Sequence, residues 1–85
     1  MGEVAVVLRV MPEGADVDLD RIEREVRACV DARKLEREPI AFGLTALRVL
    51  TVVPDAAGGT DEVERRISDI DGVRSVEVID VRRLL

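Results

Sequence analysis

Four stretches of the chain have the pattern of a β-strand. In three of them apolar and polar side chains alternate with a period of about two residues, and the remaining one, residues 44–53, is a mostly apolar run rich in Val, Leu and Thr. The four stretches cover residues 2–11, 34–40, 44–53 and 73–84. The first and third are largely apolar, which favours central strands, whereas charges and Pro39 favour edge positions for the other two. In the last stretch the apolar pair Val78-Ile79 interrupts the alternation and predicts a bulge or a register change.

Two further segments repeat apolar residues with the period of an α-helix, at about residues 19–32 and 61–71. The expected buried stripes are Leu19, Ile22, Val26, Cys29 and Val30 on the first helix, and Val63, Ile67 and Ile70 on the second. Asp16 or Asp18 can cap the first helix and Thr60 the second, and Gly72 is suited to end the second.

The order strand, helix, strand, strand, helix, strand predicts one α+β domain over residues 1–85. Right-handed crossovers then lead to a four-stranded antiparallel sheet in the order 4-1-3-2, with both helices on one face. This is the ferredoxin-like βαββαβ sandwich. Its expected core contains Leu8, Ile22, Val26, Leu47, Val63, Ile67 and Val76.

The second and third strands are joined by Ala41-Phe42-Gly43, which reads as the tip of a β-hairpin. Phe42 is the only aromatic residue in the chain. Hairpin tips project into solvent and often carry function. From the residues alone, however, burial at one end of the core is the commoner position for a large aromatic side chain.

Composition narrows the functional classes. The 18 acidic residues outnumber the 13 basic ones, giving a net charge of −5, which argues against direct binding to nucleic acid or to an anionic membrane. The chain has no histidine, no metal-ligand spacing and no nucleophile–base pair, so we expect neither an enzyme nor a bound cofactor or metal. The single Cys29, and the absence of a secretory or membrane-spanning segment, fit the cytoplasm.

Three runs of the sequence are specific enough to be matched to a known family. They are Glu38-Pro39-Ile40-Ala41-Phe42-Gly43-Leu44, the Gly58-Gly59-Thr60 before the second helix, and the terminal Asp80-Val81-Arg82-Arg83-Leu84. Together with the opening residues 1–12, these runs resemble the archaeal type of translation elongation factor 1-beta, and the resemblance extends over the whole chain.

This resemblance implies a ferredoxin-like guanine-nucleotide exchange factor for the GTPase elongation factor 1-alpha. It implies two partner-binding regions near the nucleotide and Mg²⁺ of that GTPase. One region is Ala41, Phe42 and Gly43, and the other is Arg82, Arg83 and Leu84. Eukaryotic relatives carry a lysine near the C-terminal end, and the matching position here is Arg83.

A second class of function stays open at this point. The chain can be a regulatory or assembly module that pairs through its edge strands, or that binds a small ligand on the open face of the sheet. Ala5 and Val7 of the first strand make that face partly apolar. The sequence does not predict an oligomeric state.

Overall fold

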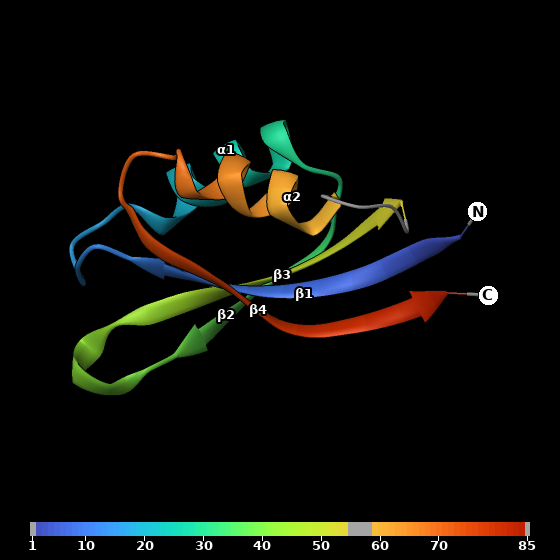
Figure 1. Cartoon of the computed structure of the whole chain (residues 1–85). Coiled ribbons are helices and arrows are strands. Elements are labelled where there is room, and N and C mark those ends of the chain that lie inside the picture. Colours follow the sequence, from blue (N-terminus) through green and yellow to red (C-terminus); the bar gives the residue numbers. More distant parts are fainter. Residues whose placement is uncertain (1, 55–58, 85) are drawn as a thin grey trace.

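The computed structural model describes residues 2–54 and 59–84, which form one antiparallel sheet and two helices (Figure 1). The elements are β1 (Glu3–Pro12), α1 (Leu19–Cys29), β2 (Ala32–Pro39), the short 3-10 turn η1 (Ala41–Gly43), β3 (Thr45–Pro54), α2 (Gly59–Ser68) and β4 (Val73–Leu84). The strand order is β2-β3-β1-β4, and both helices cover the same face of the sheet (Figure 1). The predicted ferredoxin-like arrangement, with β1 and β3 central, is confirmed.

The core lies between the sheet and the helices because alternate residues of the central strands point toward α1 and α2. In β1 the even-numbered residues from Val4 to Val10 are buried, and each pairs with a buried residue of β3, as Leu8 does with Val49. Ile22, Val26, Val63 and Ile67 close the core from the helices. The predicted core is correct except at Val76, which is only partly buried where β4 forms an edge.

The first helix ends earlier than its periodicity predicts. α1 begins after Asp18, whose side chain accepts hydrogen bonds from two backbone N–H groups of the first turn. It ends at Cys29 rather than at residue 32, because Val30 is extended (φ −136°, ψ 160°). The hydroxyl of Thr51 in β3 donates to the carbonyl of Asp31 at 2.7 Å, which draws the chain into the sheet.

The second helix is also displaced from its predicted bounds. It begins at Gly59, so Thr60 lies inside the first turn and is not the cap. It ends at Ser68, and a turn with hydrogen bonds from Ile70 N–H to Ile67 C=O and from Val73 N–H to Ile70 C=O leads into β4. Gly72 permits this turn with a φ of 94°. Residues 55–58, which precede this helix and include Gly58 of the run noted above, lie outside the described part of the chain.

A bulge in β4 confirms the irregularity predicted at Val78-Ile79. Val7 pairs with Asp80 and the next residue, Leu8, pairs with Val78, so Ile79 is the extra residue. Cross-strand partners share one face of a sheet. The inserted residue therefore exchanges the faces of every β4 side chain beyond it.

Candidate functional site

The turn between β2 and β3 places Phe42 in solvent. The residue is 97% exposed, and its neighbours Ala41 and Gly43 are exposed as well. A backbone hydrogen bond of 2.8 Å from Ile40 N–H to Leu44 C=O closes the loop. The alternative in which Phe42 fills one end of the core is therefore wrong, and the hairpin tip is where the sequence pattern places it.

The backbone of this tip is left-handed at two consecutive residues. Phe42 has φ 64° and ψ 30°, and Gly43 has φ 76°. Glycine adopts such values freely, whereas a phenylalanine in this region costs about 1–2 kcal/mol. A Cβ atom at Gly43 would meet nothing within 4 Å, so glycine is favoured here by its positive φ and not by lack of space. The aromatic ring is thus presented by a strained backbone.

The C-terminal end of β4 carries the second group of predicted site residues. Arg83 pairs with the buried Val4 and so lies on the face that bears the helices, whereas Arg82 pairs with Ala5 and lies on the open face. Arg82 Nε donates to Asp80 Oδ2 at 3.1 Å. Leu84 is 41% exposed. The two neighbouring cations therefore leave the strand in opposite directions.

The hairpin tip and the end of β4 lie at opposite ends of the molecule (Figure 1). Leu84 and Pro54 both pair with Glu3 at one end of β1, whereas the hairpin continues past the other end. The 10 residues of β3 span this interval, which at a rise of about 3.3 Å per residue corresponds to roughly 30 Å. The structure groups Ala41, Phe42 and Gly43 together, but it does not bring them near Arg82, Arg83 and Leu84.

Val81 is an exposed apolar residue that sequence reasoning did not single out. It is 51% exposed and pairs with Val6, so it shares the helix-bearing face with Arg83. Its position could not be read from the alternation, because the bulge at Ile79 reverses the faces of β4 beyond it.

A shallow depression of about 170 Å³ lies on the open face of the sheet. It is lined by Val7, Lys34, Glu36, Arg48 and Leu50. Pockets for small molecules usually occupy about 300–1,000 Å³. The depression is smaller than this range, so its size does not favour the small-ligand alternative on this face.

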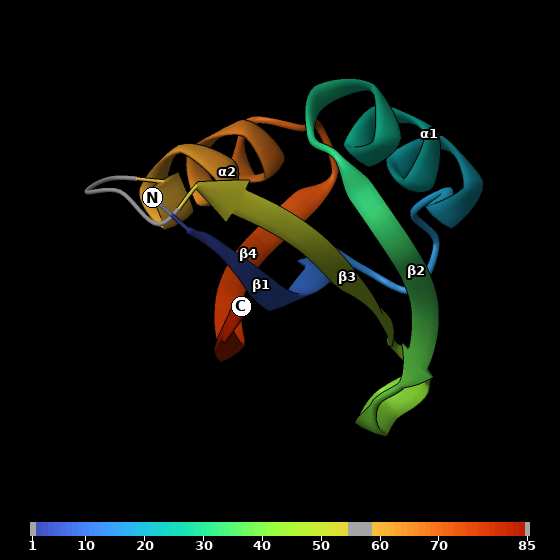
Figure 2. The ribbon, with the colours of Figure 1, turned by 90° about the vertical axis from the view of Figure 1, so that its right-hand side faces the viewer.

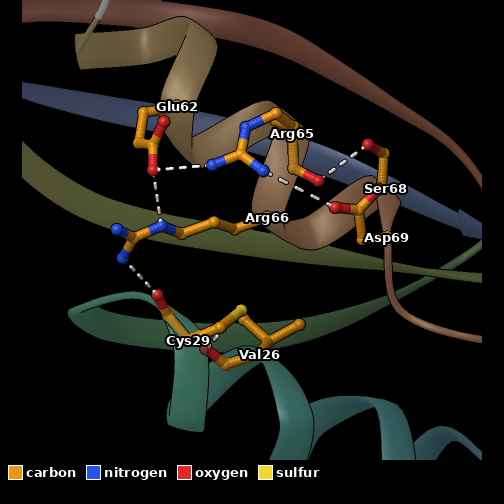
Figure 3. A network of polar contacts seen from close by, with 7 residues as sticks. All are labelled: Val26, Cys29, Glu62, Arg65, Arg66, Ser68 and Asp69. Atoms are coloured by element: carbon orange, nitrogen blue, oxygen red, sulfur yellow. Dashed lines mark hydrogen bonds and ion pairs between the residues drawn. The ribbon is translucent and has the colours of Figure 1, made fainter.

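A polar network joins the two helices at a distance from both predicted regions (Figure 3). Glu62 accepts hydrogen bonds of 2.9 Å from Arg65 and from Arg66, and these hold the pKa of its carboxyl group below its ordinary value. Arg66 also donates to the Cys29 carbonyl at 3.2 Å, linking α2 to the end of α1. A hollow of about 460 Å³ beside it is lined largely by charged side chains of the helix ends.

Cys29 belongs to this helix interface. Burial raises the pKa of its thiol, whose Sγ lies 3.6 Å from the Val26 carbonyl oxygen. A raised pKa keeps the thiol protonated at neutral pH, and the protonated form is a poor nucleophile. Cys29 therefore behaves as a small packing residue, as the sequence predicts.

Across residues 2–54 and 59–84, no cluster of three or more histidine, cysteine, aspartate or glutamate side chains is arranged to hold a metal ion. The same residues contain no helix of the length and apolar character needed to cross a membrane.

Comparison with known proteins identifies the family to which the chain belongs. Residues 5–84 match the family described as the EF-1 guanine nucleotide exchange domain. The chain belongs to the EF-1 guanine nucleotide exchange domain family. The match runs from Ala5, within β1, to Leu84, and so includes both exposed regions.

Relatives of this exchange domain are similar over their full length. Elongation factor 1-beta of Methanothermobacter thermautotrophicus is 47% identical over 89 residues, covering 100% of both chains. That of Methanosphaera stadtmanae is 44% identical over 88 residues, again with 100% of both covered. That of Halorubrum lacusprofundi is 44% identical and covers 99% of this chain and 100% of its own. The resemblance to the archaeal type of elongation factor 1-beta is thereby confirmed.

Proposed function

We propose that this protein promotes the exchange of GDP for GTP on elongation factor 1-alpha during translation elongation in the cytoplasm. Its family and the names of its relatives support the activity. The observation that carries the proposal is Phe42, the only aromatic residue, 97% exposed at the apex of a strained turn. A net charge of −5 favours a protein partner over direct contact with nucleic acid or a membrane.

Exchange of this kind requires no covalent chemistry. An exchange factor must bind the GTPase more tightly when nucleotide and Mg²⁺ are absent than when they are present. By thermodynamic linkage it then weakens their binding by the same factor. The protein therefore needs contact surfaces that distinguish two states of its partner, and the two exposed ends of the sheet are the surfaces we assign to this role.

Phe42 is the proposed anchor of the first surface. Large aromatic side chains at the centre of an interface carry much of its binding energy, whereas their neighbours contribute little. The strained tip holds the ring out in advance, which lowers the entropy cost of binding. Ala41 and Gly43 shape the turn and contact the partner through their exposed backbone.

Arg83 is the proposed cation of the second surface, with Arg82 and Leu84 beside it. A positive charge beside a bound Mg²⁺ repels the metal and competes for its carboxylate ligands. Arginine keeps its charge at every working pH, so this effect does not titrate near neutrality. Because roughly 30 Å separates this end from Phe42, the partner must extend along the whole sheet.

Phe42→Ala tests the first surface. We expect it to weaken binding of elongation factor 1-alpha by about 2–4 kcal/mol, with a corresponding loss of catalysed GDP release. The melting temperature should change by only about a few degrees, because the ring contributes nothing to the core. Phe42→Trp keeps a flat ring and should retain activity. Full activity of Phe42→Ala at limiting exchange factor would refute the anchor role.

Deletion of residues 82–85 tests the second surface. We expect slower catalysed GDP release in Mg²⁺ buffer, and a smaller loss once a chelator removes the metal, because there is then nothing to displace. The described residues among these are exposed, so the fold should persist. Arg83→Met should reproduce most of the loss, and Arg74→Met, an exposed arginine near the other end of the same strand, serves as the matched control. Equal rates for the truncated and full-length chains would exclude this role.

A further inference from the structure

The hairpin that carries Phe42 extends beyond the rest of the sheet. Pairing between β1 and β3 ends at Val10 and Leu47, whereas pairing between β2 and β3 continues to Pro39 and Thr45. The outer part of the hairpin is therefore a two-stranded arm (Figure 2). Two-stranded arms are marginally stable without further support.

Two arginines hold the base of this arm from opposite faces. On the open face, Arg9 Nε of β1 donates to Glu38 Oε1 of β2 at 3.2 Å. On the helix-bearing face, Arg37 Nε donates to Glu23 Oε2 of α1 at 2.8 Å. Arg37 also pairs with Asp20 of α1. Consecutive residues of β2 are thus tied to β1 on one side and to α1 on the other.

The burial of Ala46 is consistent with the ion pair from Arg9 to Glu38, which covers this part of the open face. Ala46 follows the pattern of β3 and points away from the helices, beside the core residue Leu47, yet it is 0% exposed. Because β3 lies between β1 and β2, the ion pair from Arg9 to Glu38 must pass over β3. A small side chain at position 46, which pairs with Glu38, leaves room for this crossing.

We propose that Arg9 and Arg37 are positioning residues that clamp the hairpin base, so that Phe42 meets its partner in one orientation. The proposal rests on the proposed function, in which Phe42 is the anchor. Neither arginine needs to touch the partner. Each limits the motion of the arm relative to the sheet. A mobile arm would have to be ordered on binding, and this entropy cost is avoided when the anchor is preorganised.

The first experiment needs no partner. The chain contains no tryptophan or tyrosine, so Phe42→Trp introduces a single fluorophore at the tip. In this background, Arg9→Met or Arg37→Met should increase the amplitude of nanosecond motion in time-resolved fluorescence anisotropy. The matched control is Glu77→Gln, which removes the other partner of Arg9, at 3.5 Å on β4 and away from the arm. Unchanged anisotropy in both methionine variants overturns the clamp.

The second experiment measures catalysed GDP release with elongation factor 1-alpha. Each methionine variant should raise the concentration of exchange factor needed for half-maximal rate about fivefold, while the maximal rate stays the same. Arg9→Lys should restore part of the loss, because its charge can still reach one carboxylate. The effect should vanish in the Phe42→Ala background, where there is no ring to position.

The outcomes distinguish the proposed clamp by Arg9 and Arg37 from the proposed anchor role of Phe42, on which it rests. An equal loss with and without the ring shows that the arginines act independently of Phe42 and overturns the positioning role. If Phe42→Ala leaves exchange unchanged, the anchor role of the hairpin is wrong, while the anisotropy still decides whether Arg9 and Arg37 hold the arm.

Discussion

Phe42 combines two features that stability alone does not favour. Its ring is almost wholly in water, and its backbone is left-handed at φ 64°. Such a conformation costs about 1–3 kcal/mol for an ordinary residue and is typical of functional sites. The adjoining Gly43 accepts its own positive φ at no cost. The backbone conformation of Phe42 thus lowers the stability of the protein, as expected for a residue that is preorganised for binding.

Phe42→Asn tests the stability cost of this backbone conformation, because asparagine tolerates the left-handed region better than phenylalanine does. We expect a gain of about 0.5–1 kcal/mol in the free energy of unfolding, together with the loss of exchange expected for Phe42→Ala. Phe42→Ala is the control, since alanine keeps the backbone cost and should leave the free energy of unfolding nearly unchanged. Urea denaturation of the three proteins measures the difference, and a destabilised asparagine variant would contradict it.

The two helices contribute to the core through a few residues each. α1 buries Ile22 and Val26 and exposes Arg24 and Arg27 on its other side. Because α1 lies over β2 and the central strands, it also supplies the carboxylates that hold Arg37. Its packing therefore supports both the core and the hairpin arm.

Ile22→Ala should lower the free energy of unfolding by about 2–4 kcal/mol, because it leaves a cavity where the side chain is now 1% exposed. Arg24→Ala, on the exposed side of the same helix, should change it by less than about 0.5 kcal/mol. Urea unfolding followed by far-ultraviolet circular dichroism measures both. Similar effects for the two variants would mean that α1 does not pack through this stripe.

The molecule as a whole is a long sheet with its proposed contact surfaces at the two ends. Its principal extents are 42, 21 and 17 Å, and the hairpin tip and the end of β4 lie at opposite ends of the long direction (Figure 1). Both ends are joined to one continuous sheet. In the proposed function, this sheet sets the distance between Phe42 and Arg83.

This separation predicts independent effects on exchange. Phe42→Ala and Arg83→Met should lower the efficiency of GDP release by factors that multiply, because residues this far apart with no shared contacts are additive in free energy to within about 0.5 kcal/mol. The four proteins of a double-mutant cycle, measured in Mg²⁺ buffer, test the expectation. A double variant no worse than the more impaired single variant would show that the two ends act as one unit.

Features that depend on neighbours along the chain could be predicted from the sequence. Periods of two and of about three and a half residues located the strands and helices, and charges with Pro39 marked the edge strands. The adjacent residues Phe42 and Gly43, between two strand patterns, located the hairpin tip. These signals are local because alternation, helical periodicity and turn formation depend on neighbours along the chain.

Features that depend on contacts between distant segments are visible only in the folded protein. α1 ends at Cys29, where Val30 is extended and the Asp31 carbonyl accepts a hydrogen bond from the Thr51 hydroxyl of β3. The faces of Arg82 and Arg83 follow from a bulge whose effect appears only in the register of β4 against β1. The bridge from Arg9 to Glu38 joins residues 29 positions apart across an intervening strand. No local pattern encodes such contacts, because each depends on which strands lie side by side and in what register.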